Sequence, residues 1–132
     1  MTQLHSITFE VRDYECDMQG IVNNSVYQNY IEHARHKFLL SHNVDFAALT
    51  KQGIHLVVMR AELDFKRSLI SGDAFYVTTK MARQSKFKFD FFQEVYRSED
   101  NALMLKAKIV GASISDKGKP LVYTGLDHVF EH

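Results

Sequence analysis

Residues 16–40, CDMQGIVNNSVYQNYIEHARHKFLL, pass from a polar segment into a helical pattern, and this change marks the start of the longest helix that the sequence predicts. From Asn24 onward the apolar side chains that share one helical face are Tyr27, Tyr30, Ile31, Ala34 and Phe38. This spacing predicts an amphipathic helix from Asn24 to about Leu40, roughly 25 Å long. Asn23 or Asn24 can cap the helix, because a short amide oxygen accepts a backbone N–H of the first turn.

One strand is expected before this helix and four after it. SITFEVR at residues 6–12 alternates apolar and polar side chains, as half-buried strands do. A short helix around VDFAALTKQ ends at Gly53, and short turns then separate four further strands: HLVVMRAELDF (55–65), AFYVTTKM (74–81), KFKFDFFQEVYR (86–97) and ALMLKAKIVGASIS (102–115). Short turns favour antiparallel neighbours, so we expect an α+β protein with one long helix on an antiparallel sheet of about five strands.

The strand patterns also predict which side chains form the core. Five residues of the stretch 55–65 have the same parity and are expected to face one side: Val57, Met59, Ala61, Leu63 and Phe65. Three aromatic residues alternate with charged ones and are expected to pack on the long helix rather than to line a substrate pocket: Phe87, Phe89 and Phe91.

Composition limits the possible classes of protein. The chain has 132 residues, 45% of them hydrophobic, and no linker or repeat, so residues 1–132 are predicted to form a single domain. Sixteen basic residues balance sixteen acidic ones, which argues against bulk electrostatic binding to nucleic acid or to a membrane. The lone Cys16 cannot form an internal disulfide, and no signal-like or membrane-spanning apolar run is present. We therefore expect a cytoplasmic protein.

The segment before the helix contains more polar groups than a helix cap requires. Asp17 can be a turn or cap residue, or it can be a catalytic carboxylate. Gly20 indicates a backbone conformation or a close approach that a side chain would block. The start of a helix adds backbone N–H groups that lack internal partners and attract negative charge. On spacing alone, the turn or cap role of Asp17 is the more common of the two.

Six residues of this segment, followed by EHAR at 32–35, form the pattern D-x-x-G-x-V-N-N-x-x-Y-x-x-x-x-E-x-A-R: Asp17, Gly20, Val22, Asn23, Asn24 and Tyr27. The pattern resembles the signature of the 4-hydroxybenzoyl-CoA thioesterase-like acyl-CoA thioesterases. The order of the elements is similar over nearly the whole chain. The resemblance implies a hotdog fold, in which a curved antiparallel sheet wraps one long central helix.

The resemblance also implies an acyl-CoA thioesterase that needs no metal and no other cofactor. Asp17 would attack the thioester as nucleophile or activate water as general base, and the backbone N–H near Asn24 would bind the oxyanion. Gly20 would belong to the same catalytic loop. Many members carry a histidine where this chain has Ile21 or Asn24. The acyl group, and the choice between CoA and acyl carrier protein, stay open.

Further residues are candidates for binding the substrate. Asn23 and Tyr27 belong to the motif itself. Phosphates of a coenzyme A tail would favour cationic side chains at a pocket rim, although such residues are usually a solvated face; the candidates are Lys66, Arg67, Lys86 and Lys88.

The residues alone raise two other kinds of site. Cys16 could act as a nucleophile, but no histidine lies at local pairing distance in the sequence. Glu32, His33 and His36 could suggest a metal site, but both histidines fall opposite the apolar stripe and are expected to be solvated. No metal site is therefore predicted.

Two other functions are compatible with the same fold. A hotdog dehydratase or hydratase usually pairs a histidine with an acid, and residues 13–27 contain no histidine. A non-catalytic acyl-thioester binding or scaffold protein is the other alternative, since fold alone does not fix function. The resemblance implies a homodimer or homotetramer with the active site at the subunit boundary. Apolar residues on the second strand parity also need cover: Val58, Tyr76, Phe92, Tyr96, Met104 and Val110.

Overall fold

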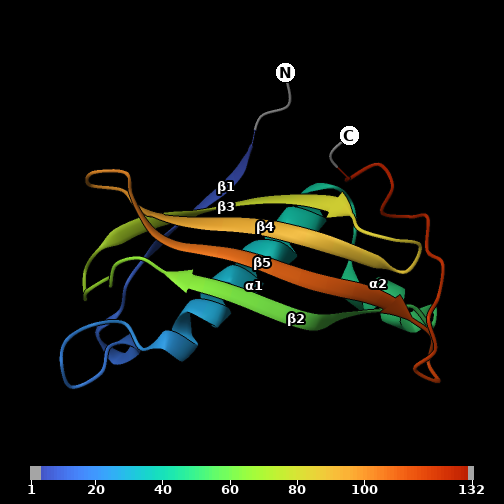
Figure 1. Cartoon of the computed structure of the whole chain (residues 1–132), viewed down its shortest axis with the longest axis horizontal. Coiled ribbons are helices and arrows are strands. Elements are labelled where there is room, and N and C mark those ends of the chain that lie inside the picture. Colours follow the sequence, from blue (N-terminus) through green and yellow to red (C-terminus); the bar gives the residue numbers. More distant parts are fainter. Residues whose placement is uncertain (1–3, 131–132) are drawn as a thin grey trace.

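The computed structural model describes residues 4–130 and contains one long helix packed on a five-stranded sheet (Figure 1). The strands are β1 (His5–Glu10), β2 (His55–Phe65), β3 (Ala74–Arg83), β4 (Lys88–Arg97) and β5 (Ala102–Ile114). The helices are α1 (Asn24–Ser41) and α2 (Phe46–Lys51), and a 3-10 turn, η1, covers Asp13–Glu15. The predicted α+β class, with one long helix and five strands, is confirmed.

The strands follow the order β1-β3-β4-β5-β2, and every neighbouring pair is antiparallel. Figure 1 looks through the sheet onto α1, which crosses behind it obliquely. β1 and β2 are the two edge strands, so each has one side without a strand partner within residues 4–130. None of the helices described is long and apolar enough to cross a membrane.

The predicted apolar stripe of α1 forms the centre of the core. All five residues of the stripe are buried: Tyr27, Tyr30, Ile31, Ala34 and Phe38. The Tyr30 ring lies 4.7 Å from the Phe75 ring of β3, and the Phe38 ring lies 6.4 Å from that of Phe91 on β4. Burying one large apolar side chain contributes about 1.5–3 kcal/mol. The stripe therefore fixes which face of α1 turns away from the sheet.

The aromatic stripe of β4 is confirmed only in part. Phe89 and Phe91 are buried, with exposed fractions of 3% and 4%, whereas Phe87 is 36% exposed. The prediction for Phe87 is wrong because β4 begins at Lys88, so Phe87 still belongs to the preceding turn. The Phe89 ring fills the space above Gly111, where an added Cβ would lie 2.2 Å from its Cε2 atom. Gly111 is thus required by a close approach of an aromatic ring.

The predicted alternation along β2 is also corrected. The pairing of β2 with β5 shifts between Val58 and Arg60, which is the register change of a β-bulge. As a result Val58 and Ala61, three residues apart, line the same cavity beside α1. Met59 lies at the bulge and is 59% exposed, so it does not share a face with Ala61 as predicted.

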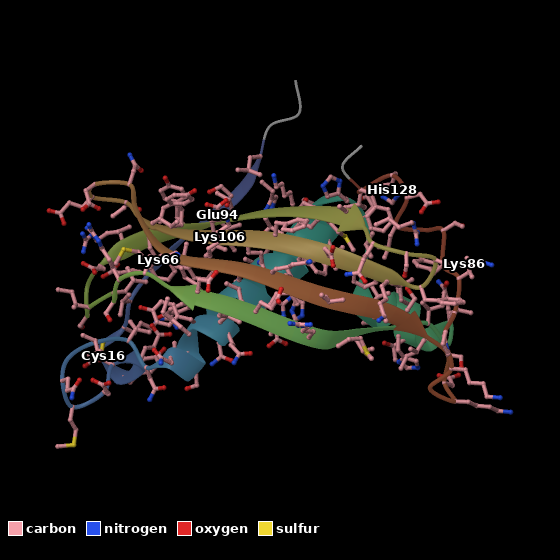
Figure 2. The ribbon with its side chains drawn as sticks, in the orientation of Figure 1. Cys16, Lys66, Lys86, Glu94, Lys106 and His128 are labelled. Atoms are coloured by element: carbon pink, nitrogen blue, oxygen red, sulfur yellow. The ribbon has the colours of Figure 1, made fainter. Side chains whose placement is uncertain are left out.

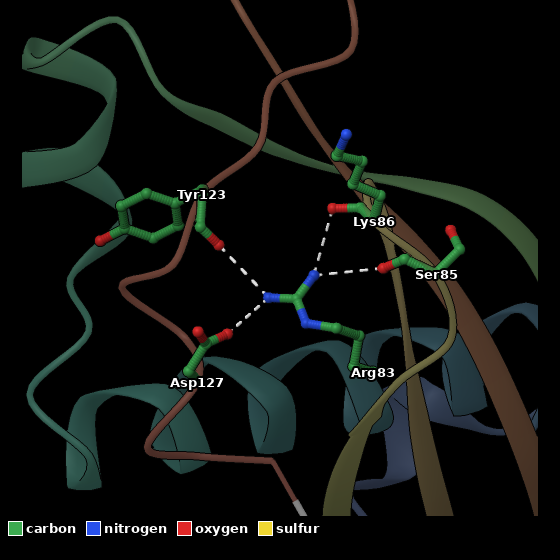
Figure 3. Close-up of polar contacts among 5 residues, drawn as sticks. All are labelled: Arg83, Ser85, Lys86, Tyr123 and Asp127. Atoms are coloured by element: carbon green, nitrogen blue, oxygen red, sulfur yellow. Dashed lines mark hydrogen bonds and ion pairs between the residues drawn. The ribbon is translucent and has the colours of Figure 1, made fainter.

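The segment after β5 folds back over the end of the helix–sheet core. Figure 3 shows its anchor, the guanidinium of Arg83 at the end of β3. Arg83 donates to the Asp127 carboxylate at 2.6 Å and to the Tyr123 carbonyl at 3.4 Å, and it lies over the Phe130 ring. The same guanidinium donates to the carbonyls of Ser85 and Lys86 in the β3–β4 turn. One arginine thus joins the C-terminal segment to that turn.

Candidate active site

Asp17 lies in a short turn that returns on itself before α1. The Asp17 N–H donates to the Ile21 carbonyl at 2.9 Å, and the Gly20 N–H donates to the Asp17 carbonyl at 3.0 Å. Gly20 has a φ of +81°, a left-handed conformation that favours glycine. The Asp17 carboxylate is exposed, and its Oδ1 accepts the Gln19 N–H at 2.8 Å. The turn therefore exposes the Asp17 carboxylate to solvent, and one of its two oxygens, Oδ1, already accepts a hydrogen bond.

The turn is attached firmly to the body of the protein. The Val22 N–H donates to the Leu69 carbonyl at 2.9 Å, and the Asn23 N–H donates to the Glu15 carbonyl at 3.1 Å. The Tyr30 hydroxyl donates to Glu15 Oε1 at 2.7 Å. Burial, together with this hydrogen bond, raises the pKa of Tyr30, so the phenol stays protonated and keeps its donor. The position of Asp17 relative to α1 is thus held by both backbone and side-chain contacts.

The start of α1 leaves an N–H group available. Asn23 is the N-cap, because its side-chain oxygen accepts the backbone N–H of Ser25 at 3.0 Å. Asn24 is the first helical residue, and its backbone N–H donates to no acceptor within residues 4–130. Such an N–H at the positive end of a helix dipole can stabilise a developing negative charge on oxygen. The two sequence alternatives for the cap are therefore resolved in favour of Asn23.

Tyr27 does not face solvent. Its side chain is 2% exposed, and its hydroxyl accepts the backbone N–H of Leu69 at 2.9 Å. Burial raises the pKa of Tyr27, and the hydrogen bond to Leu69 opposes this shift. In this chain the tyrosine joins α1 to the β2–β3 connection that carries Leu69, which is a positioning role.

The four cationic candidates divide between two ends of the sheet. Lys66 and Arg67 follow β2 directly, and both backbone N–H groups donate to the Met104 carbonyl. Figure 2 places Lys66 at the end of the sheet that also holds Cys16, and it places Lys86 at the opposite end. Lys88, the first residue of β4, is exposed. Only Lys66 and Arg67 thus lie at the Asp17 end of the same chain.

The two other sites that the sequence raised are placed as follows. Cys16 is half-buried and forms an isolated antiparallel bridge with Val22. His33 and His36 are exposed, as expected, and His36 Nε2 lies 3.8 Å from a carboxylate oxygen of Glu32. No group of three metal-ligating side chains occurs within residues 4–130.

One cavity, about 760 Å³ in volume, lies between β1 and α1 and is not lined by residues 17–24. Glu10, Glu15, Tyr30 and His33 are among its lining residues, whereas Asp17 and Asn24 are not. Its size alone does not connect it with the predicted chemistry.

A second hollow runs along α1 beside β2, and we call it the α1–β2 groove. It consists of two adjoining cavities of about 240 and 330 Å³ that share Glu32, Arg35 and Val58. The smaller cavity begins at Gln28, one helical turn after Asn24. The larger one extends to Phe46 at the start of α2. The groove therefore starts next to the helix N-terminus and continues along the helix.

Sequence reasoning missed the polar contact at the base of this groove. Arg35 Nη1 donates to Gln93 Oε1 at 3.1 Å, across 58 residues of sequence. The amide nitrogen of Gln93 donates to the Ile31 carbonyl at 2.9 Å and to Thr79 Oγ1 at 3.1 Å. A signal was available, because Gln93 interrupts the inward-facing apolar residues of β4 and is only 1% exposed.

Comparison with known proteins gives a consistent picture. The sequence profile of the thioesterase-like superfamily matches residues 11–122. The chain is 31% identical over 121 residues to the chloroplastic acyl-acyl carrier protein thioesterase ATL3 of Arabidopsis thaliana, covering 92% of this chain and 64% of that protein. It spans 62% of a second Arabidopsis relative, ATL2, which has a similar name. The chain thus covers less than two thirds of either plant protein.

Solved structures agree on the fold. A 1,4-dihydroxy-2-naphthoyl-CoA thioesterase from Synechocystis superposes with a TM-score of 0.89 at 18% identity, covering 96% of this chain and 95% of that one. A hypothetical protein from Aquifex aeolicus superposes with a TM-score of 0.88 at 27% identity, covering 96% and 99%. The predicted hotdog fold is thereby confirmed. With the profile match over most of its length, the chain belongs to the thioesterase-like superfamily.

Proposed function

We propose that this protein hydrolyses acyl thioesters with Asp17 as the reacting carboxylate. The observation that carries the proposal is the occurrence, in one turn before a long helix, of an exposed Asp17 and of an Asn24 N–H that has no acceptor within residues 4–130. A carboxylate and an oxyanion donor are the two groups that acyl transfer requires. The names of the plant relative and of the Synechocystis enzyme both refer to thioester hydrolysis, which supports the same reaction.

In the general-base route Asp17 takes a proton from water, and the resulting hydroxide adds to the acyl carbon. The negative charge that develops on the carbonyl oxygen is stabilised by the Asn24 N–H and by the helix dipole. Collapse of the intermediate breaks the carbon–sulfur bond, and the leaving thiolate takes up a proton. In the nucleophilic route Asp17 itself attacks the acyl carbon, the carbon–sulfur bond breaks and the thiolate leaves with uptake of a proton, and water then cleaves the mixed anhydride to the free acid and Asp17. Both routes place the same demands on Asp17 and Asn24.

The other residues of the motif position these two groups. Gly20 permits the left-handed turn, and Asn23 caps the helix so that the Asn24 N–H is presented. Lys66 and Arg67 are suited to bind carrier phosphates at the Asp17 end. Lys86 lies at the opposite end of the sheet, and Lys88 is two residues further along the chain. These two lysines would therefore bind the carrier phosphates of a thioester held by the Asp17 loop of a neighbouring subunit.

The carrier is proposed to be a pantetheine thioester, either CoA or acyl carrier protein. The name of the plant relative refers to acyl carrier protein and that of the Synechocystis enzyme to CoA. We propose a cytoplasmic location because the chain has a single cysteine, which cannot form an internal disulfide.

We further propose a homodimer or homotetramer that covers the β2 edge. Met104 and Val110, which were expected to need a partner, are already buried within one chain. Val58, Met59 and Phe65 of β2 remain 53%, 59% and 46% exposed on an unpaired edge strand. Such an edge is usually protected or paired. Sedimentation equilibrium at micromolar concentration tests this assembly, and an active species of 15.3 kDa would contradict it.

The function is tested by measuring thiol release from a panel of acyl-CoA and acyl carrier protein thioesters. The Asp17→Asn variant should lower kcat by about 10²–10⁴-fold, because the amide cannot act as base or nucleophile. Its oxygen can still accept the Gln19 N–H, so the melting temperature should change little. Asp13→Asn, which removes another exposed carboxylate of the same segment, is the matched control. Near wild-type turnover in Asp17→Asn would contradict the proposed role of Asp17.

A further inference from the structure

The α1–β2 groove contains a guanidinium that the protein itself satisfies only in part. Arg35 is half-buried, and its one hydrogen bond within residues 4–130 is the donation to Gln93. None of the described carboxylates lies within 4.0 Å of it in an ion pair. A guanidinium has five N–H donors, so most of those of Arg35, which lines both cavities of the groove, have no protein acceptor within residues 4–130. Burial lowers the pKa of Arg35, and the nearby Glu32 opposes this shift.

Arg35 is held in a fixed position from the core side. Both donors of the buried Gln93 amide are used by the Ile31 carbonyl and Thr79 Oγ1, so its oxygen must point toward Arg35. The Arg35 guanidinium carbon also lies 5.9 Å from the centre of the Phe91 ring. A planar cation fixed by an amide and an aromatic ring is preorganised to donate further hydrogen bonds into the groove.

The groove joins Arg35 to the start of α1. Asn24, Gln28, Ile31 and Arg35 are spaced at i, i+4, i+7 and i+11, so they lie along one helical face. From Asn24 to Arg35 the helix rises roughly 16 Å, and a helical side chain leans back toward the N-terminus, so an acyl chain of about ten carbon atoms would span the gap. Most of the remaining lining is apolar, including Leu56, Phe89 and Phe91.

The charge of the groove favours an uncharged oxygen over a carboxylate. Glu32 lines both cavities and offsets the charge of Arg35. Although His36 is exposed, partial desolvation of its ring lowers its pKa against the opposing effect of Glu32, so this imidazole adds little positive charge to the groove near pH 7. An acyl carbonyl group can accept the unused Arg35 donors without adding a second negative charge beside Glu32.

We infer that the α1–β2 groove binds the acyl chain and that Arg35 is a specificity-determining residue that selects acyl groups carrying an uncharged carbonyl oxygen along the chain. This inference rests on the proposed thioesterase function. It goes beyond that function because it names the class of acyl group and the side chain that recognises it.

The test compares decanoyl-CoA, 9-oxodecanoyl-CoA and the CoA monothioester of decanedioic acid as substrates. The wild-type protein should favour the oxo substrate over decanoyl-CoA by about 10- to 100-fold in kcat/KM, the range expected for a hydrogen bond to a charged donor. Arg35→Met, which keeps the length of the side chain, should bring this ratio close to one while decanoyl-CoA is still hydrolysed. Arg35→Lys should retain part of the preference, since it keeps the charge but loses the planar fork.

The matched control is Arg97→Met, which removes an arginine paired with Asp100 in the turn after β4 and should leave the ratio unchanged. An oxo preference that persists in Arg35→Met would overturn the inference, as would equal turnover of the oxo and plain substrates by the wild-type protein. Preference for the decanedioic acid thioester would overturn the assignment of an uncharged group.

Loss of hydrolysis is kept separate from loss of recognition by a binding measurement. Calorimetric titration with 9-oxodecanoic acid and with decanoic acid reports on the groove even if no thioester is cleaved. Tighter binding of the oxo acid to the wild-type protein, with equal binding of both acids to Arg35→Met, supports the inference although the proposed function has failed. Equal affinity of both acids for the wild-type protein overturns the inference.

Discussion

Replacing Asn24 by proline removes the proposed oxyanion donor and leaves the helix intact. Proline has no N–H, and its fixed φ suits the first position of a helix, which Asn24 occupies. Proline also requires an extended residue before it, and Asn23 has φ −63° and ψ 139°. The lost N–H donates to no acceptor within residues 4–130, so no hydrogen bond of the described fold is broken. The free energy of unfolding should therefore stay the same or rise slightly.

The effect on catalysis should be large. Removing one oxyanion donor typically lowers kcat by about 10²–10³-fold, which corresponds to roughly 2.7–4 kcal/mol in the transition state. The assay is steady-state thiol release, together with a thermal unfolding curve for each variant. Asn24→Ala is the control for the side chain, because it keeps the backbone N–H and should retain most of the turnover.

A backbone ester at position 24 separates loss of the donor from the bulk of the proline ring. Incorporating the α-hydroxy analogue of asparagine replaces the N–H with oxygen and adds no atoms to the site. It should lower kcat as much as Asn24→Pro does. If both variants turn over thioesters at the wild-type rate, the start of α1 does not stabilise the oxyanion and the reasoning is refuted.

Three further substitutions test the structure around the site by chemical or thermal denaturation. Asn23→Ala should lower the free energy of unfolding by about 0.5–2 kcal/mol because it removes the helix cap, whereas Asn24→Ala should change it by no more than about 0.5 kcal/mol. The reverse order would mean that Asn24, and not Asn23, caps the helix. Tyr27→Phe leaves the buried Leu69 N–H without its acceptor and should cost about 1–3 kcal/mol, and an unchanged stability would mean that water replaces the hydroxyl. Gly111→Ala should cost about 1–3 kcal/mol, because the new Cβ would lie 2.2 Å from the ring that covers this glycine; a neutral result would show that the ring can move.

The order and type of the elements could be predicted because their local signals agree. The start of α1 at Asn24 is marked by a polar cap followed at once by helical periodicity, and the structure begins the helix there. The stretch 55–65 is bounded by Gly53 and by a change to basic residues, and β2 covers the same range. Phe87 was misplaced because alternation continues into the turn, whereas strand pairing stops at Lys88.

The bulge in β2 could not be predicted from the sequence. In HLVVM, residues of both parities are apolar, so the pattern does not determine which of them faces the helix. The pairing with β5 decides it, by skipping one residue between Val58 and Arg60. This shift places Val58 beside Ala61 in the groove, and it leaves Met59 exposed at the edge. A contact between strands that are distant in the sequence thus sets the lining of the candidate acyl site.

The two parts of the candidate site differ in how far the sequence could reveal them. The Asp17 turn and the helix start are adjacent in the chain, so their chemistry could be predicted from one short stretch. Arg35 and Gln93 meet only because β4 packs beneath α1, and although Arg35 belongs to the EHAR motif, neither residue alone indicates the other. A glutamine among inward-facing phenylalanines must have partners, since an unpaired buried amide is costly. The helix side chain that satisfies the amide oxygen of Gln93 is Arg35, and Arg35 also lines the α1–β2 groove.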